Sequence, residues 1–167
     1  PAEIRTAVER LQGEVEADSI EVVDFIPSNM TFPPALNVDW TKTDQGPDGL
    51  RVYTRLEADA GELPQGGLQP GQSATVDIRL IVKDSLQAGT QIRNWAEISE
   101  VFDNEGRPQV DVDSEPDNEN DDEFVTNDYV GGDANNEGED EDDHDPADVF
   151  LKAFDLALYK ILGPDQS

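Results

Sequence analysis

Residues 74–82 read ATVDIRLIV, and the apolar side chains in this stretch fall on every second residue. Side chains alternate between the two faces of a β-strand, so this period of two places Val76, Ile78 and Leu80 together on one face. A Pro-Gly turn cluster at residues 69–72 precedes the stretch and marks its start. The pattern therefore predicts a strand with one face in a hydrophobic core.

Three further segments outward from this strand show the same alternation. They are residues 19–25, 50–56 and 90–101, with turn clusters at 45–49 and 64–67 between them. In the first of these, Ile20 and Val22 share one face while Val23 and Phe25 share the other. Several short strands separated by such turns predict an all-β fold, a β-sandwich.

The C-terminal region gives two competing patterns. Apolar residues in 147–162 follow a helical spacing, opened by Pro146 and closed by Gly163-Pro164, which predicts a helix there. Residues 155–162 also fit a strand, with Leu156, Leu158 and Leu162 on one face, although this pattern is weaker.

The charge of the chain is large and concentrated. The 167 residues carry a net charge of −28, and residues 103–148 contain 20 acidic residues and one basic residue. This window, with a net charge of −19 and six asparagines, is too polar to fold by hydrophobic burial alone. It is either a solvated acidic linker or a site at which cations neutralise the carboxylates.

Calcium is the cation that this window fits best. Calcium takes six to eight oxygen ligands from Asp, Glu, Asn and backbone carbonyls in flexible loops, whereas magnesium demands a small octahedral shell. We expect two or more Ca²⁺ ions. The candidate ligands are Asp111, Asp113, Asp117, Asn118, Asn120, Asp122, Asp128, Asp133, Asp140, Asp142, Asp143 and Asp145.

Composition also excludes several classes of function. A strongly acidic chain does not bind nucleic acid directly, because phosphate binding needs a basic surface. No apolar run approaches 18 residues, so no membrane insertion is expected. The chain has no cysteine, and its carboxylates lie in a local run instead of the spaced pair that a glycosidase needs, so we do not expect an enzyme.

Several motifs occur in an order that resembles a known family. They are IEVVDFIP (20–27), LQPGQSATV (68–76), NWAEIS (94–99), DVDSEPDN (111–118), EDDHDP (141–146) and FDLALYK (154–160). This series is similar to the tandem conserved repeats of large bacterial surface proteins, akin to the SdrD B-like repeats of adhesins, over residues 20–162. The resemblance implies an immunoglobulin-like sandwich, an extracellular or cell-surface location, bound calcium, and a structural or adhesive role.

The order of the motifs suggests how copies assemble. In the family the FDLALxK motif opens a repeat, but here it lies at residues 154–160, so the chain is expected to lack its own first strand and to carry that of a following unit. We therefore expect an immunoglobulin-like sandwich at 1–102, an acidic calcium-binding lobe at 103–148 and a C-terminal donor strand at 149–167. The donor strand either completes a second copy, head to tail, or belongs to a tandem array, or folds back on its own domain. Its partner-binding residues are Phe154, Leu156, Leu158 and Ile161.

The function expected from this is a structural subunit of a bacterial extracellular filament or adhesin, stabilised by calcium and assembled by donor-strand complementation. The alternative is a module that binds a glycan or a host protein through the loops at residues 28–49.

A few individual residues carry their own expectations. Lys160, Asn94 and Glu97 have the residue types of an isopeptide crosslink, and Asp145-Pro146 is a possible cleavage site. The simpler interpretation of each is an ordinary turn, edge or metal role. We expect His144 and Asp24 to face solvent. We expect Trp40 and Trp95 to be core residues of opposed sheets.

Overall fold

A computed structural model describes residues 2–8, 16–47, 49–109, 120 and 144–152, with residues 2–8, 42 and 145 described by their backbone only. All statements below concern these residues. The described calcium-ligand candidates are Asn120 and the backbone of Asp145.

β-strands dominate the described chain. The strands are β1 (Ala2–Val8), β2 (Ser19–Ile26), β3 (Met30–Thr31), β4 (Trp40–Gly46), β5 (Gly49–Glu57), β6 (Ala74–Val82), β7 (Gln91–Phe102) and β8 (His144–Phe150). A single 3-10 turn, Pro34–Leu36, is the helical element of the described residues. The predicted all-β class is confirmed, and the four strands predicted from alternation match β2, β5, β6 and β7 to within one residue at each end.

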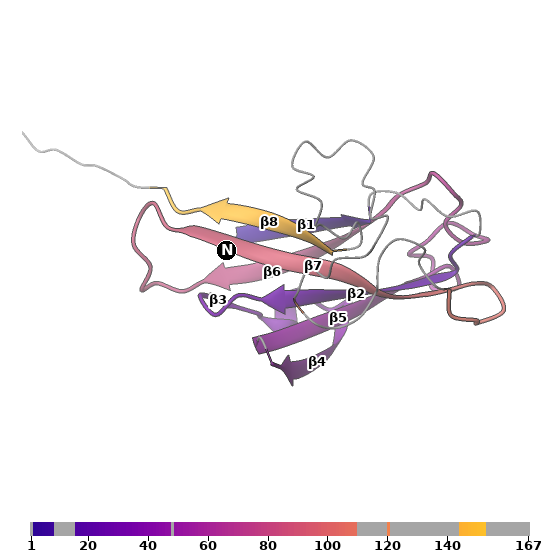
Figure 1. Ribbon diagram of the computed structural model, residues 1–167, viewed down its shortest axis with the longest axis horizontal. Helices are drawn as coiled ribbons and strands as arrows, with labels where there is room; N and C mark the ends of the chain where they lie inside the picture. The colour runs from indigo at the N-terminus through magenta and orange to yellow at the C-terminus, as the bar shows by residue number, and fades with distance from the viewer. Residues whose placement is uncertain (1, 9–15, 48, 110–119, 121–143, 153–167) are drawn as a thin grey trace, which may run out of the picture.

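The strands form two antiparallel sheets (Figure 1). One sheet has the order β1-β6-β3 and the other the order β4-β5-β2-β7-β8. No helix in the described residues has the length and apolar character needed to span a membrane.

The two sheets share one hydrophobic core. From the smaller sheet, Val76, Ile78 and Leu80 of β6 contribute buried side chains, as their alternation predicts. From the larger sheet, Ile20 and Val22 of β2 pack into the same cluster. The period-two pattern therefore assigned the core-facing side of both strands correctly.

The larger sheet is also buried at its centre on the opposite face. Val23, Phe25 and Tyr53 form a second buried cluster there, with Trp95 packed against it. Trp40, by contrast, is buried in the main core. The two tryptophans therefore lie on opposite faces of one sheet, and the expectation of opposed sheets was wrong because β4 and β7 belong to the same sheet.

A glycine allows the segment before β2 to pack tightly on a turn. Ala17 and Leu68 exchange two backbone hydrogen bonds of 3.0 and 2.7 Å, and both side chains are buried. Gly67, at φ +80°, precedes Leu68, and a Cβ there would lie 2.8 Å from the Ala17 carbonyl oxygen. Only glycine combines this backbone conformation with so close an approach.

Strand β8 corrects the helix predicted from residue 147. Residues 147–150 pair with β7 as an edge strand, with Ala147 opposite Asn94 and Val149 opposite Ile92. Pro146 lacks an N–H group but is tolerated because an edge strand pairs on one side only. Ala147 and Val149 pack against the core with a period of two, which overrides the helical spacing. β8 also crosses the boundary predicted between residues 148 and 149, since its residues from 144 onward belong to the sheet.

Candidate functional site

A carboxylic acid and an amide lie side by side inside the main core. Asp24 of β2 is fully buried and Asn94 of β7 is 2% exposed. The Asn94 Nδ2 group donates a hydrogen bond of 2.8 Å to Asp24 Oδ2. The Oδ1 atom of each side chain is also buried and accepts no hydrogen bond from any residue that the structure describes.

The register of the central strands creates this pair. Asp24 is opposite Ala96 on one side and Val52 on the other, and it shares the core face with Val22 and Ile26 because side chains alternate along β2. Asn94 lies two residues before Ala96 on the same face of β7. The pair is thus diagonal across two neighbouring strands.

Burial dominates the electrostatics of the pair. Removal from water raises the pKa of Asp24 from 3.8 to about 7, and the hydrogen bond from Asn94 lowers it only in part. The expectation that Asp24 faces solvent was therefore wrong. It rested on the position of Asp24 near a strand end, whereas β2 continues to Ile26 between two neighbouring strands.

The carboxyl group that contacts Asn94 is a different one from the Glu97 carboxyl group named in the sequence-based expectation. Asn94 and Glu97 are three residues apart on β7, so their side chains point to opposite faces of the sheet. Glu97 is opposite Val23, a member of the cluster on the other face. Asp24, and not Glu97, is the carboxyl group in contact with the amide.

A second group of polar and aromatic side chains occupies that other face. The rings of Trp95 and His144 are stacked, with centroids 4.5 Å apart and an interplanar angle of 2°. Phe25 meets the same imidazole edge-on at 6.0 Å, and Asn120 Oδ1 lies 3.2 Å from His144 Nε2. His144 is only 3% exposed, so the expectation that it faces solvent was wrong. Its acidic sequence neighbours suggested exposure, but its place opposite Glu97 in β8 puts it against two aromatic rings.

The described residues include few of the predicted calcium ligands. Of the twelve candidates, Asn120 is described with its side chain beside His144, and Asp145 is placed by its backbone opposite Ala96. The other ten candidates lie outside the described residues, as do the predicted partner-binding residues Phe154, Leu156, Leu158 and Ile161. Within the described part of the chain, no three His, Asp or Glu side chains are grouped as a metal site would group them.

An ion pair links β7 to the edge strand β8. Arg93 of β7 donates hydrogen bonds of 3.0 and 3.1 Å to the two carboxylate oxygens of Asp148 on β8. The hydrogen bonding from Arg93 is the main cause that lowers the pKa of Asp148 below its usual value. The edge strand that carries His144 is thereby fastened to β7 by side chains as well as by its backbone.

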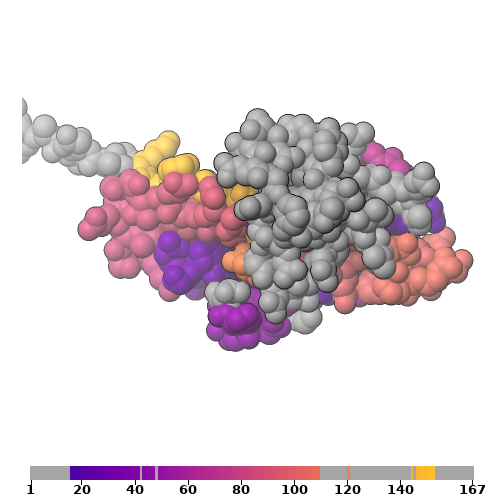
Figure 2. Space-filling model, viewed as in Figure 1, coloured from indigo at the N-terminus to yellow at the C-terminus, as the bar shows by residue number. Residues whose placement is uncertain are grey.

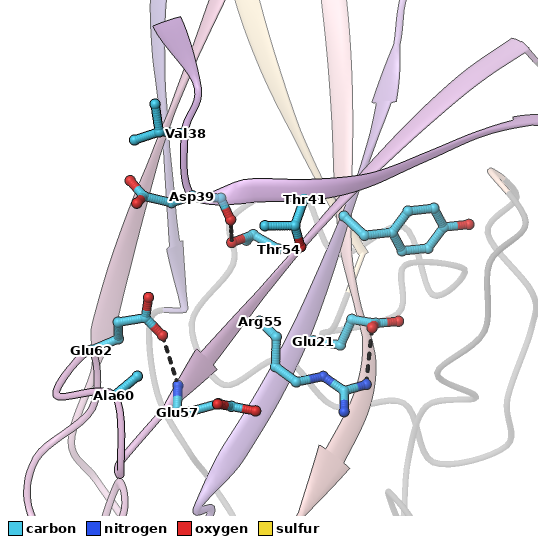
Figure 3. Close-up of a pocket in the computed structure, with 10 residues that line it drawn as sticks. Glu21, Val38, Asp39, Thr41, Thr54, Arg55, Glu57, Ala60 and Glu62 are labelled. Carbon is cyan, nitrogen blue, oxygen red and sulfur yellow. Dashed lines mark hydrogen bonds and ion pairs between the residues drawn. The ribbon is translucent and has the colours of Figure 1, made fainter. Parts of the chain in front are cut away.

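A shallow hollow of about 480 Å³ lies on the outer face of β2, β4 and β5 (Figure 3). Its lining is mostly acidic and polar, and Arg55 is its cation. Arg55 donates to Glu21 at 2.9 Å and to Glu100 at 2.6 Å, and Figure 3 shows its guanidinium group directed at Glu21. Val38, 77% exposed, stands at the rim.

Comparisons of this chain with protein-family models, with curated proteins and with solved structures found no match. Its interpretation therefore depends on the geometry of the described residues. Sequence reasoning found Asn94 from its residue type, but it missed Asp24 as its partner. The one available signal was an acidic residue, Asp24, with apolar residues on both sides in the stretch VVDFI.

Proposed function

We propose that this chain is a structural unit of an extracellular bacterial filament or adhesin, built on an immunoglobulin-like sandwich and joined head to tail by β-strand donation. The observation that carries the proposal is the edge of the smaller sheet at β1. Among the described residues β1 pairs with β6 on one side, and its other side has no strand partner. A row of free backbone N–H and C=O groups at such an edge can accept another strand.

Two of the other three edge strands in the described sheets, β8 and β3, are less suited to accept a strand. β8 carries Pro146 together with Asp145 and Asp148, and proline and charge both discourage pairing. β3 has only two residues, too few for a stable ladder. β1 has seven residues, no proline and one charged residue of each sign.

The proposed donor is the segment at residues 150–162. Phe154, Leu156 and Leu158 follow a period of two, so a strand there would present one continuous apolar face. β8 forms an outer edge of the larger sheet, and part of it is visible at the surface in Figure 2. A donated strand gives a head-to-tail contact, which propagates into a filament when the rotation between copies does not close a ring.

Deletion of residues 153–167 tests the donation, because it removes the donor and leaves β8 intact. We expect the full chain to form filaments in electron micrographs and the shortened chain to remain monomeric. A Leu156→Asp, Leu158→Asp variant should behave like the deletion, while an Asp84→Asn variant at an exposed loop residue should assemble normally. Filaments that persist after the deletion would refute strand donation.

We further propose that two or more calcium ions hold the acidic region at residues 103–148. A net charge of −19 over 46 residues opposes compaction, and each ion removes two charges. The melting temperature should rise with millimolar calcium, fall again with chelator, and respond much less to magnesium. An Asp111→Asn, Asp113→Asn variant should lose part of this gain, whereas Asp84→Asn should keep it. Titration calorimetry that detects no heat with calcium at millimolar concentration would refute the calcium sites.

A second candidate function is binding of a glycan or host protein. The hollow in Figure 3 favours it, because Val38, Asp39 and Thr41 line it, and these lie in the region 28–49 that was predicted to carry the contacts, with Thr41 in β4. A glycan array separates the two functions: specific binding that a Thr41→Arg variant abolishes would support the adhesin module.

A further inference from the structure

Strand β4 forms one edge of the larger sheet, at the opposite end from β8 (Figure 1). It pairs with β5 on one side, and no strand among the described residues pairs with its other side. The strand has seven residues and no proline, and Thr43 and Gln45 are exposed. A strand edge of this kind presents backbone N–H and C=O groups with which another strand can pair.

The hairpin between β4 and β5 determines which residues of β4 direct their backbone groups outward. Gly46 belongs to the pair that closes the two-residue connection to β5, and the register from there back to Lys42 has no shift. The closing pair of such a hairpin is hydrogen-bonded, and hydrogen-bonded pairs alternate with non-hydrogen-bonded pairs along antiparallel strands. Gly46, Asp44 and Lys42 therefore bond to β5. Thr43 and Gln45 direct their backbone N–H and C=O groups away from it.

The sequence of β4 is self-complementary in one antiparallel register. When two copies of the strand pair about a two-fold axis at Thr43, Lys42 of each copy is opposite Asp44 of the other. The two outward-directed Thr43 residues then exchange their backbone hydrogen bonds. Residues of opposite charge that lie directly opposite each other stabilise a strand pair, whereas like charges destabilise it. A shift of the axis by one residue places Lys42 opposite Lys42, or Asp44 opposite Asp44, so the charges favour the register centred on Thr43.

The position of Asp44 suits this contact. Arg51 Nε donates a hydrogen bond of 2.8 Å to Asp44 Oδ1, and the Tyr53 hydroxyl group donates one of 3.3 Å to Oδ2. The Asp44 side chain remains 39% exposed. Lys42 is two residues away from Asp44, so both positions belong to the same face of the strand. Residues of opposite charge would therefore meet on one face of the joined sheets.

We propose that the β4 edge is a two-fold interface, centred on Thr43, through which two copies of this chain join their larger sheets into one continuous sheet. The contact is separate from the strand donation proposed at β1. A two-fold contact uses the same surface of both copies, so it closes after two copies and does not build a filament by itself.

The net charge of −28 on each copy opposes any association between copies. At an ionic strength of about 0.15 M, exposed charges separated by more than about 8 Å are largely screened. Under these conditions the residues directly opposite each other decide whether the contact forms, and the test is made at this ionic strength.

Disulfide crosslinking tests the register. The chain has no cysteine, so one introduced thiol reports on a single position. The Cα atoms of a hydrogen-bonded antiparallel pair are about 5.5 Å apart, a distance that a disulfide spans, so Thr43→Cys should give a covalent dimer with a mild oxidant such as diamide. The two Gln45 positions would be four residues out of register, or about 13 Å apart, so Gln45→Cys should crosslink at least about tenfold more slowly.

Sedimentation velocity over a range of protein concentrations measures the association itself. The full chain carries Leu156→Asp and Leu158→Asp in this experiment, so that strand donation does not contribute. We expect an equilibrium between monomer and dimer. Lys42→Glu should raise the dissociation constant at least about tenfold, because it places like charges opposite each other twice. Lys83→Glu makes the same change of charge at an exposed residue beyond the end of β6, in the other sheet, and should leave the dissociation constant unchanged.

These results decide the proposal. Faster crosslinking of Thr43→Cys than of Gln45→Cys, together with the weaker dimer of Lys42→Glu, supports the interface. A chain that remains monomeric at every concentration overturns it. A dimer that Lys42→Glu leaves unchanged, or equal crosslinking at the two positions, places the contact elsewhere and also overturns it. Strand donation at β1 stands or falls separately, because the sedimenting chain carries the two substitutions that prevent it.

Discussion

The stability of the fold should fall as the pH rises from about 4 to about 7, because of one buried carboxyl group. Burial raises the pKa of Asp24 from 3.8 to about 7 in the folded state. Between these two values the folded protein holds a proton that the unfolded chain has lost. The free energy of unfolding therefore decreases with pH across this interval and levels off above about pH 7.

The size of this effect follows from the distance between the two pKa values. One pH unit corresponds to about 1.4 kcal/mol, so a gap of about three units corresponds to about 4 kcal/mol. This is a large part of the 5–15 kcal/mol that stabilises a typical domain. Asp24→Asn keeps the size of the side chain and removes the titration. At pH 8 the variant should be more stable than the parent by up to about 4 kcal/mol, and at pH 4 the two should be nearly equal.

Urea denaturation at a series of pH values, with calcium held constant, measures this difference. Asp148→Asn is a matched control of opposite sign. Arg93 lowers the pKa of Asp148, so the stability that this carboxylate contributes is present above its unfolded pKa and lost as the pH falls through its folded pKa. A difference between parent and Asp24→Asn that stays constant from pH 4 to pH 8 would refute the reasoning.

Two further predictions concern the packing of the fold. Ile78→Ala, at a core side chain with no exposed surface, should cost about 3 kcal/mol in urea denaturation, whereas Ile81→Ala, 42% exposed on the same strand, should cost under about 1 kcal/mol. Gly67→Ala should lower the melting temperature more than Gly71→Ala, since both have a positive φ but only at Gly67 would the new Cβ meet a backbone oxygen at 2.8 Å. Equal losses of stability in Ile78→Ala and Ile81→Ala would contradict the burial of Ile78 in the core. Equal losses in Gly67→Ala and Gly71→Ala would contradict the close approach of Gly67 to the Ala17 carbonyl oxygen.

Local pattern was enough to determine four of the described strands, β2, β5, β6 and β7, and their faces. Alternation in β6 assigned Ile78 and Leu80 to the core, and the two apolar faces of β2 were readable from Ile20, Val22, Val23 and Phe25. These predictions succeed because a strand has a fixed period of two, so each residue's face follows from its neighbours. The all-β class follows from the same periodicity and the turn residues between the strands.

Only the tertiary structure determined which residues meet across strands. Asp24 and Asn94 are 70 positions apart, and their contact depends on the register between β2 and β7. The burial of His144 likewise depends on its pairing with β7, since an acidic local sequence gives no sign of a neighbouring Trp95. Register and strand order come from the packing of the whole core, and a one-residue shift would move every side chain to the other face. For that reason the sequence alone determined β2, β5, β6 and β7 with their inward faces, while the fold alone placed a carboxyl group against an amide inside the core.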